Sequence, residues 1–500
     1  MKTKCIMIQG TMSDAGKSVI CAALCRIFRQ DGYTVAPFKS QNMALNSFVT
    51  ADGLELGRAQ AAQAEAAGIP CDVRMNPILL KPSSDTGSQL IVMGEVRGQY
   101  DAKDYFRMKR GLIPEIMKAY NSLAGENEII VIEGAGSPVE INLRQDDIVN
   151  MGLAELVNAP VILAGDIDRG GVFAQLYGTV ALLQPEERKR IIGTVINKFR
   201  GDVELLRPGL KQLEELTGVP VLGVVPWMKV DIDDEDSLAP RLERAETVDR
   251  PLDIAVIRLP HVSNFTDFSP LEEHPSIGLR YVNRLEQLGH PDLVILPGTK
   301  NTMGDLRWLR ETGLATKILM LHEAGTAVLG VCGGYQMLGR SLSDPEGVEG
   351  GGSMEGLGLL PCETVFAGEK TRTRRRAVCT AGPFAGVRLE GYEIHMGRTA
   401  SAAAPFCRME DGAEDGAAEE TVFGTYLHGL FDSGELVKRL AGWLGERKRI
   451  RIPERKAENR ASYRNWQYDL LADAVRNSLD MKAIKQAMEA FQHDQNTGTD

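Results

Sequence analysis

The sequence predicts an α/β protein with two doubly wound domains whose sheets are mainly parallel. Two observations predict this fold class. Short apolar and β-branched runs alternate with helical patterns, and the runs fall into two series separated by a polar, turn-rich segment. Such alternation is typical of a parallel sheet covered by helices on both faces. The length of 500 residues also exceeds what one hydrophobic core usually serves, so two or three domains are expected.

The first series of runs predicts a domain over residues 1–232. Its expected strands lie at 4–10, 129–133, 160–165, 191–196 and 220–225, and its expected helices include 17–31, 53–67 and 171–183. An acidic, turn-rich stretch follows, and we interpret residues 233–250 as a linker between domains.

The second series predicts a domain over residues 251–445. Its expected strands lie at 252–257, 293–296, 327–330 and 420–423, and the glycine-rich stretch 341–355 is expected to be a loop. Apolar residues then recur at helical spacing between 466 and 490. Residues 446–500 are therefore expected to form a helical extension that ends in a polar tail.

Composition argues against several classes of protein. The net charge of −11 is the wrong sign for a large nucleic-acid surface, so no nucleic-acid partner is expected. No stretch approaches the roughly 20 apolar residues of a membrane span, and the N-terminal apolar run is too short for a signal peptide. Eight scattered cysteines lack metal-binding spacing, which favours a reduced, cytoplasmic protein. No feature of the sequence predicts an oligomeric state.

A reactive cysteine is predicted in residues 328–334 (VLGVCGG). The apolar run stops at Gly330, and Cys332 lies between glycines in the pattern G-x-C-x-G. This pattern is the cysteine version of a nucleophile elbow, a strained strand-to-helix turn that exposes the reactive side chain at the end of a sheet. A buried, inert thiol is the alternative. The glycines on both sides favour the nucleophile.

Several residues are predicted to complete a site around this thiol. His428 follows the expected strand 420–423 and precedes a glycine, which makes it a candidate base, with a structural histidine as the alternative. The backbone amides of Gly298 and Gly333 are candidates for an oxyanion hole. Gln336 lies one helical turn beyond the thiol and would face the same pocket, so it is a candidate for binding the substrate of this site.

A phosphate-binding loop is predicted at residues 10–18 (GTMSDAGKS), between a strand and a helix. In such a loop the backbone from Gly10 and Thr11 to Gly16 surrounds the phosphates, and Lys17 adds a positive charge. Ser18 is the expected Mg²⁺ ligand. Five residues instead of four separate the two glycines, and this variant resembles the loop of dethiobiotin synthetase and its relatives. A glycine-rich turn with a surface lysine is the alternative.

Two further residues are candidates for the nucleotide site. Glu133 ends the strand 129–133, where an acid beside a phosphate loop can hold Mg²⁺ directly or through water. A capping or solvated glutamate is the alternative. Asn197 follows the strand 191–196 and is a candidate for reading the nucleotide base, although a turn asparagine explains it equally well. The expected cofactor is Mg²⁺ together with ATP.

At this point the residues resemble known families. The cysteine elbow with His428 resembles the class I glutamine amidotransferase site, and the N-terminal phosphate loop with Glu133 resembles an ATP-binding domain of the dethiobiotin synthetase type. Both domains in this order resemble the cobyric acid synthase family. The strings that carry this resemblance are residues 41–46 (QNMALN), 81–89 (KPSSDTGSQ), 134–138 (GAGSP) and 391–395 (GYEIH).

The resemblance implies a P-loop NTPase-like domain followed by an amidotransferase-like domain, with ATP, glutamine and a corrinoid as small-molecule partners. It implies amidation of side chains b, d, e and g of adenosylcobyrinic acid a,c-diamide through an acyl phosphate. It also suggests corrinoid contacts in the two polar strings, which are Gln41, Asn42, Asn46, Ser83, Ser84 and Asp85.

One position departs from the class I amidotransferase pattern. These enzymes usually carry a glutamate two residues after the histidine, and this chain has Leu430 there. The cobyrinate-amidating branch resembles the chain in lacking that acid. Asp432 and Glu393 are both candidates for orienting His428, and the sequence does not rank them.

Three alternative functions remain open at this stage. A related glutamine-dependent amidoligase could act on the a and c positions of cobyrinic acid or on a cell-wall precursor. An ATP-driven switch protein would share the sheet and the phosphate loop, but it has no use for Cys332 and His428. A binding module with a degenerate amidotransferase domain is also disfavoured by these two intact residues.

Overall fold

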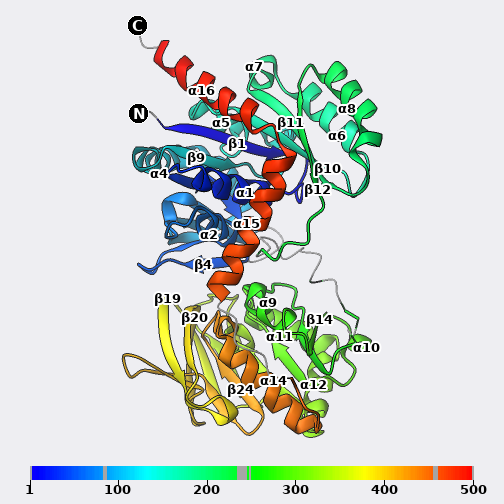
Figure 1. The fold of residues 1–500 in the computed structure, drawn as a ribbon. Coiled ribbons are helices and arrows are strands. Elements are labelled where there is room, and N and C mark those ends of the chain that lie inside the picture. The colour runs from blue at the N-terminus through cyan, green and yellow to red at the C-terminus, as the bar shows by residue number, and fades with distance from the viewer. Residues whose placement is uncertain are drawn as a thin grey trace.

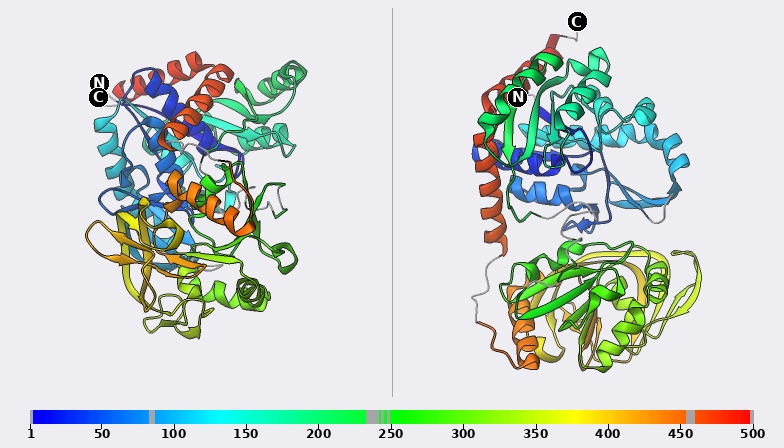
Figure 2. Two further views of the ribbon diagram at one scale, coloured as in Figure 1. Left: turned by 60° about the horizontal axis from the view of Figure 1, so that its bottom comes forward. Right: turned by 90° about the vertical axis from the view of Figure 1, so that its right-hand side faces the viewer.

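The computed structural model describes residues 3–82, 87–232, 242, 245–246, 249–453 and 460–497. The chain forms two lobes that lie one above the other (Figure 1). The first lobe contains residues up to 232 together with the C-terminal helices, and the second lobe contains residues 249–453 (Figure 2). Most of the expected linker 233–250 lies outside the described residues.

The first lobe is built on a parallel sheet in the order β12-β11-β10-β1-β9-β2. Its strands are β1 (Lys4–Gly10), β2 (Val35–Phe38), β9 (Ile129–Glu133), β10 (Val161–Asp166), β11 (Ile191–Phe199) and β12 (Val221–Pro226). The side chains of Ile6, Met7 and Ile8 are all buried, as expected for a central strand that is covered on both faces. The register pairs Ile8 with Glu133, so β1 and β9 end at the same edge.

The prediction of one helix over residues 53–67 is only partly right. Residues Glu55–Gly57 form strand β5, which pairs antiparallel with β4 (Ser47–Val49), and α2 covers only Arg58–Ala67. Gly53 has a φ of +79°. This left-handed backbone suits the turn of a hairpin and interrupts any helix that starts earlier.

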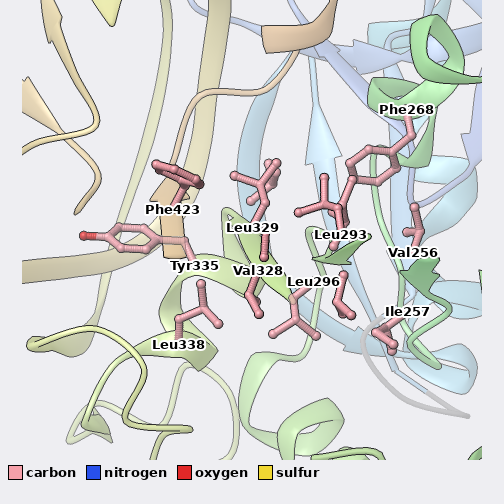
Figure 3. Close-up of a cluster of buried hydrophobic side chains, with 14 of the residues drawn as sticks. Val256, Ile257, Phe268, Leu293, Leu296, Val328, Leu329, Tyr335, Leu338 and Phe423 are labelled. Atoms are coloured by element: carbon pink, nitrogen blue, oxygen red, sulfur yellow. The ribbon is translucent and has the colours of Figure 1, made fainter. Parts of the chain in front are cut away.

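The second lobe is built on a sheet in the order β14-β13-β15-β16-β24-β23, parallel except for the last pair. Its strands are β13 (Leu252–Ile257), β14 (Ile277–Val282), β15 (Leu293–Leu296), β16 (Ala327–Val331), β23 (Ala417–Glu419) and β24 (Val422–Thr425). Figure 3 shows side chains of this sheet, among them Val256, Leu293 and Val328, packed into one buried core. The core therefore holds the carboxyl ends of β15, β16 and β24 side by side.

The sequence did not predict the antiparallel sheets. The stretch 341–355, expected to be a loop, contains β17 (Ser341–Asp344) and β18 (Gly352–Glu355), which form a hairpin. The Asp344 carboxylate accepts hydrogen bonds from the backbone N–H groups of Val348, Glu349 and Gly351, which organises the glycine-rich turn. The hairpin joins a sheet that also contains β19 (Cys362–Cys379), β20 (Arg388–Ser401), β21 (Cys407–Met409) and β22 (Glu414–Asp415).

A smaller mixed sheet in the first lobe includes parts of the polar strings 41–46 and 81–89. It has the order β3-β6-β7-β8, and its strands are β3 (Gln41–Met43), β6 (Ile78–Pro82), β7 (Gly87–Val92) and β8 (Glu95–Asp101). Strands β3 and β6 pair in parallel, and the other pairs are antiparallel. The sheet places residues 41–43 beside residues 78–80, although they are far apart in the sequence.

Helices surround both main sheets. In the first lobe they are α2 together with α1 (Lys17–Gln30), α3 (Ala102–Met108), α4 (Ile113–Glu126), α5 (Met151–Leu156), α6 (Val172–Leu182), α7 (Pro185–Arg188) and α8 (Val203–Thr217). In the second lobe they are α9 (Ser269–Glu272), α10 (Leu285–Leu288), α11 (Thr302–Glu311), α12 (Leu314–Glu323), α13 (Gly333–Leu338) and α14 (Gly434–Lys448). Among the described residues, no helix is both long enough and apolar enough to cross a membrane.

The C-terminal helices return to the first lobe. Helices α15 (Arg460–Ser478) and α16 (Met481–Thr497) run along it, shown in red in Figures 1 and 2. Leu471 and Val475 of α15 are fully buried in a core cluster shared with α1. Arg26 of α1 also forms an ion pair of 2.8 Å with Asp469. The expected helical extension is thus present, and it completes the core of the lobe that carries the phosphate loop.

Candidate active site

Cys332 lies at the turn between β16 and α13. Its backbone has φ +53° and ψ −111°, a strained conformation for a residue with a side chain. A Cβ atom on Gly334 would overlap the carbonyl oxygen of Leu296, and one on Gly330 would lie 2.6 Å from the nitrogen of Tyr335. Both glycines are therefore required by close backbone packing. The structure confirms the elbow geometry that the G-x-C-x-G pattern predicts.

His428 follows β24 at the same edge of the sheet and is fully buried. Its Nδ1 lies 2.6 Å from Oδ2 of Asp267, and the other carboxylate oxygen accepts from the backbone N–H of Gly429 at 3.0 Å. Burial by itself would lower the pKa of His428. The Asp267 carboxylate, with a contribution from Cys332, outweighs burial and raises that pKa to about 10.

The acid that orients His428 is therefore Asp267, and neither sequence candidate occupies this place. Glu393 forms an ion pair with Arg375 at 3.1 Å, and Asp432 forms one with Arg460 at 2.8 Å. Asp267 belongs to a short 3₁₀ helix, η5 (Phe265–Phe268), which lies 161 residues before the histidine in the sequence.

The loop after β15 packs between the elbow and the histidine. A Cβ on Gly333 would lie 3.1 Å from the backbone nitrogen of Thr299, and a Cβ on Gly298 would lie 3.0 Å from Cε1 of His428. Gly298 and Gly333 are thus close to the two reactive side chains. Their amides as oxyanion donors stay a prediction.

Gln336 is buried, and its amide group is used within the protein. Its Oε1 accepts from the Thr302 hydroxyl at 3.0 Å, and its Nε2 donates to the Tyr426 hydroxyl at 3.0 Å. The side chain therefore braces α13 against neighbouring elements. A direct contact between Gln336 and glutamine stays a prediction.

The phosphate loop connects β1 to α1 as the sequence predicts. Gly16 has a φ of +89°, and a Cβ there would overlap the Asn197 side chain. Lys17 is buried, and its Nζ donates to the backbone carbonyls of Met12 at 3.0 Å and Gly136 at 3.2 Å. The ammonium group is therefore held inside the curve of the loop, where it can face an anionic ligand.

Glu133 is the centre of a buried polar cluster beside this loop. Its carboxylate accepts from the Ser18 hydroxyl at 2.9 Å, from Lys39 at 2.8 Å and from Gln63 at 2.5 Å. Magnesium bound to a nucleotide usually takes one or two protein oxygens, the rest coming from phosphates and water. The adjacent oxygens of Ser18 and Glu133 fit such a site, and Lys39 balances the carboxylate charge.

Asn197 and Thr11 link the loop to neighbouring elements through their side chains. The Asn197 amide donates to the carbonyl of Ala15 at 2.9 Å, so this residue holds the loop in shape. The Thr11 hydroxyl lies 3.1 Å from Oε1 of Gln175. A contact between Asn197 and a nucleotide base stays a prediction.

A cavity of about 370 Å³ opens next to the phosphate loop. Residues 135, 137 and 138 line one side, and Gly136 between them contacts Lys17. Leu80, Pro82 and Ser88 of the β6–β7 hairpin line another side. The remaining wall contains both aromatic and charged side chains, which include Tyr100, Tyr105, Phe106, Lys109, Arg144, Asp101, Glu140 and Asp147.

The predicted corrinoid-binding residues are distributed unevenly around this cavity. Gln41 lines it and accepts a hydrogen bond from Tyr105. Asn42 is buried behind it and donates to Gln60 at 3.0 Å, and Asn46 is buried near the second lobe. Ser83, Ser84 and Asp85 lie outside the described residues.

Comparisons with known proteins match the chain along almost its whole length. Residues 6–238 match the CobQ/CobB/MinD/ParA nucleotide binding domain, and residues 253–436 match the CobB/CobQ-like glutamine amidotransferase domain. Cobyric acid synthases from Lachnoclostridium phytofermentans and Ruminiclostridium cellulolyticum are each 54% identical over 97% of this chain, covering 99% and 97% of their own lengths. The cobyric acid synthase from Yersinia enterocolitica is 52% identical over 98% of this chain and 99% of its own. The chain belongs to the cobyric acid synthase family.

Asp267 is the residue of this cobyric acid synthase family member that sequence reasoning missed. A single aspartate in a loop has the same appearance as an ordinary capping residue. One signal was available, because residues 258–268 follow the expected strand 252–257, and β13 is the immediate neighbour of β15. Polar residues after neighbouring parallel strands gather at the same edge of a sheet. That rule makes Asp267 one candidate for the acid that orients His428, but other polar residues of the same loop satisfy it equally well.

Proposed function

We propose that the protein amidates the b, d, e and g carboxylate side chains of adenosylcobyrinic acid a,c-diamide to give adenosylcobyric acid. ATP activates each carboxylate, and glutamine supplies the ammonia. The observation that carries this proposal is the pairing of a Cys332–His428–Asp267 arrangement with a phosphate loop whose lysine contacts the segment that lines a cavity, in a chain of this family. Neither a switch protein nor a degenerate binding module needs both centres.

Glutamine hydrolysis is proposed to begin at Cys332. The sulfur, as thiolate, attacks the amide carbon of glutamine, and the proton on His428 passes to the departing nitrogen, so that ammonia leaves and a thioester forms. Water then attacks the thioester, glutamate leaves, and the thiol is restored. The amides of Gly298 and Gly333 are the proposed donors to the developing oxyanion. Asp267 keeps the imidazole ring oriented and charged before the attack.

Carboxylate activation is proposed at the phosphate loop. An oxygen of the corrinoid carboxylate attacks the γ-phosphorus of ATP, ADP leaves, and an acyl phosphate forms. Ammonia then attacks the acyl carbon and displaces inorganic phosphate, which gives the amide. Lys17 neutralises charge on the transferring group, and Ser18 with Glu133 would hold Mg²⁺, which supplies further charge neutralisation when bound.

The cavity beside the loop is the proposed place for the reacting edge of the corrinoid. Its volume suits part of a large ligand, and its walls combine aromatic surface with Lys109 and Arg144. Burial lowers the pKa of Lys109, and the nearby Asp146 and Asp147 oppose that shift. Cations at this wall would orient the substrate's carboxylates toward the phosphate loop.

The test is an amidation assay with the purified full-length chain. Adenosylcobyrinic acid a,c-diamide is incubated with ATP, Mg²⁺ and either glutamine or ammonium chloride, and mass spectrometry counts the amides formed. We expect four amidations with either nitrogen source, each consuming one ATP. Absence of amidation with both sources contradicts the proposal. In a parallel assay with cobyrinic acid as the substrate, amidation at positions a and c alone would instead support the related amidoligase.

We also propose that the protein works in the cytoplasm. All eight cysteines are free thiols, and seven of them are buried. Disulfides persist in oxidising compartments, whereas free thiols are usual in the reducing cytoplasm. Cell fractionation with an antibody to the chain tests this location.

A further inference from the structure

Ser47 of the first lobe contacts Asn264 and Tyr392 of the second lobe, and both of these residues contact His428. It begins strand β4 and is almost fully buried. Its backbone N–H donates to Oδ1 of Asn264 at 3.1 Å, and its carbonyl accepts from the Tyr392 hydroxyl at 3.3 Å. One peptide segment of the synthetase lobe is therefore held by two side chains of the amidotransferase lobe.

Asn264 and Tyr392 each contact His428 directly. The Asn264 amide nitrogen lies 3.5 Å from Nε2 of His428, and the Tyr392 ring is stacked on the imidazole with a centroid distance of 5.3 Å and an angle of 19°. The backbones of Tyr392 and His428 also exchange two hydrogen bonds, at 3.1 and 2.8 Å. Asn264 immediately precedes η5, which carries Asp267. Movement at either residue would therefore alter the orientation of His428.

The other side of Ser47 leads to the cavity. Its hydroxyl accepts from Nζ of Lys81 at 3.0 Å, and Lys81 also donates to Glu55 at 2.8 Å. Lys81 lies between Leu80 and Pro82, and both of these neighbours line the cavity. Ser47 therefore links Lys81, whose sequence neighbours line the cavity, to the two residues that contact His428.

A second contact holds the β6–β7 hairpin, which contains Lys81, against the amidotransferase lobe. Lys370 of β19 donates to Glu55 at 2.6 Å and to Gln89 of β7 at 3.4 Å. Burial would raise the pKa of Glu55, but Lys370 and Lys81 hold that pKa well below its usual range. Buried ionic contacts of this kind tolerate little displacement, because a separated partner would be left charged and desolvated. A shift of the β6–β7 hairpin is therefore transmitted to Ser47.

We propose that Ser47 is a positioning residue that couples occupancy of the synthetase cavity to glutamine hydrolysis. Corrinoid in the cavity fixes the β6–β7 hairpin and Lys81, Ser47 then holds Asn264 and Tyr392 in place, and His428 is kept in the orientation that Cys332 requires. The coupling operates because the ligand favours one of two arrangements of these contacts. The inference rests on the proposed function, since that function assigns the cavity to the corrinoid.

The test compares glutamine hydrolysis in the presence and absence of ATP and the corrinoid diamide, within each variant. In the parent we expect stimulation of about fivefold or more, the lower end of typical coupling between sites. Tyr392→Phe removes the hydroxyl that binds the Ser47 carbonyl and keeps the ring. Ser47→Ala removes only the link to Lys81. In both variants we expect the stimulation to fall to about twofold or less, through kcat and not through the KM for glutamine.

A matched control is Arg372→Met, which removes a different contact between the lobes. Arg372 donates to Glu95 at 2.6 Å and to the carbonyl of Gly94. This variant should keep the stimulation of the parent. Amidation with ammonium chloride, measured in every variant, shows whether the synthetase lobe is folded.

Each outcome decides between the two proposals. Equal stimulation in the parent, Ser47→Ala and Tyr392→Phe overturns the role of Ser47. An equal loss of stimulation in Arg372→Met also overturns it, because the loss of any contact between the lobes would then abolish the stimulation. A parent that amidates with ammonia but hydrolyses glutamine no faster with both ligands overturns the coupling and leaves the proposed function intact. A parent that amidates with neither nitrogen source overturns both.

Discussion

The two proposed catalytic centres differ in how much of each comes from one stretch of the sequence. The phosphate loop is one continuous stretch, residues 10–18, and its lysine is held by backbone carbonyls of Met12 and Gly136. The glutaminase centre combines Cys332 and His428 with Asp267 from an element far earlier in the chain. Local sequence therefore specifies the loop of the first centre, which Glu133 and Asn197 join from other strands. The edge of a parallel sheet assembles the whole of the second centre.

The two centres also differ in the number of partners that stabilise their charged side chain. Glu133 beside the phosphate loop lies among four polar partners, and Lys39 is one of them, at 2.8 Å. His428 depends mainly on one carboxylate, because burial alone would lower its pKa. A single substitution should thus have a more specific effect in the glutaminase centre. The following variants test that expectation.

The largest expected effect separates the two centres completely. Cys332→Ala should lower glutamine-dependent amidation by about 10⁴-fold or more, because the nucleophile is lost. Amidation with ammonium chloride should be unchanged, since that step uses only the phosphate loop and the cavity. The measurement is amide formation with each nitrogen source. Loss of both activities in a folded variant would show that the centres are not separable.

The next effect tests the dependence of His428 on Asp267. Asp267→Asn keeps the size of the side chain but removes its charge, so we expect glutaminase kcat to fall by about 10²- to 10⁴-fold. Burial would then dominate, and the pKa of His428 should move from about 10 to below its usual value of 6.5. NMR titration of the histidine ring measures the shift. An unchanged pKa would exclude Asp267 as its cause.

The same pair predicts a pH dependence of stability. The native pKa of His428 is raised from 6.5 to about 10, so the native state retains a proton that the unfolded chain releases within this interval. The stabilisation by Asp267 is complete below pH 6.5 and is lost as the pH rises toward 10. Thermal unfolding of the parent should therefore show a decline over this window that Asp267→Asn lacks.

A smaller effect is expected in the phosphate loop. Lys17→Ala should lower amidation by about 10²- to 10³-fold with glutamine and with ammonia alike, because one preorganised charge is lost from the transfer step. Glutamine hydrolysis without corrinoid should persist. Lys211→Ala, on the exposed face of α8, is the control and should leave amidation unchanged. Retained amidation in Lys17→Ala would contradict the assignment of the ATP site.

The smallest effect concerns the C-terminal helix that supports this loop. Leu471→Ala should lower the free energy of unfolding of the first lobe by about 2–4 kcal/mol, because it leaves a cavity against α1. Leu470→Ala is the matched control, since Leu470 is 41% exposed, and should change it by less than about 0.5 kcal/mol. Urea unfolding followed by fluorescence of Trp466 measures both. Equal effects would indicate that α15 does not stabilise the first lobe.

Much of the fold followed from local pattern. The parallel strands, the elbow at Cys332 and the loop at residues 10–18 were predicted because each depends on neighbours in the sequence. The hairpin β17–β18 was missed, because its glycine-rich turn resembles an irregular loop until strand pairing is known. The start of α2 was misplaced for the same reason, since β5 depends on partners outside its own segment: it pairs with β4, and its Glu55 forms ion pairs with Lys81 and Lys370.

The sequence by itself determined the two chemistries, since a nucleophile elbow and a phosphate loop are short, continuous patterns with fixed backbone requirements. Only the tertiary structure decided which acid orients His428, that α15 covers the ATP lobe, and that Ser47 meets Asn264 and Tyr392. Each of these contacts joins segments more than 150 residues apart. Such contacts arise from the order of strands in a sheet and from burial between lobes, and no local spacing of residues encodes them.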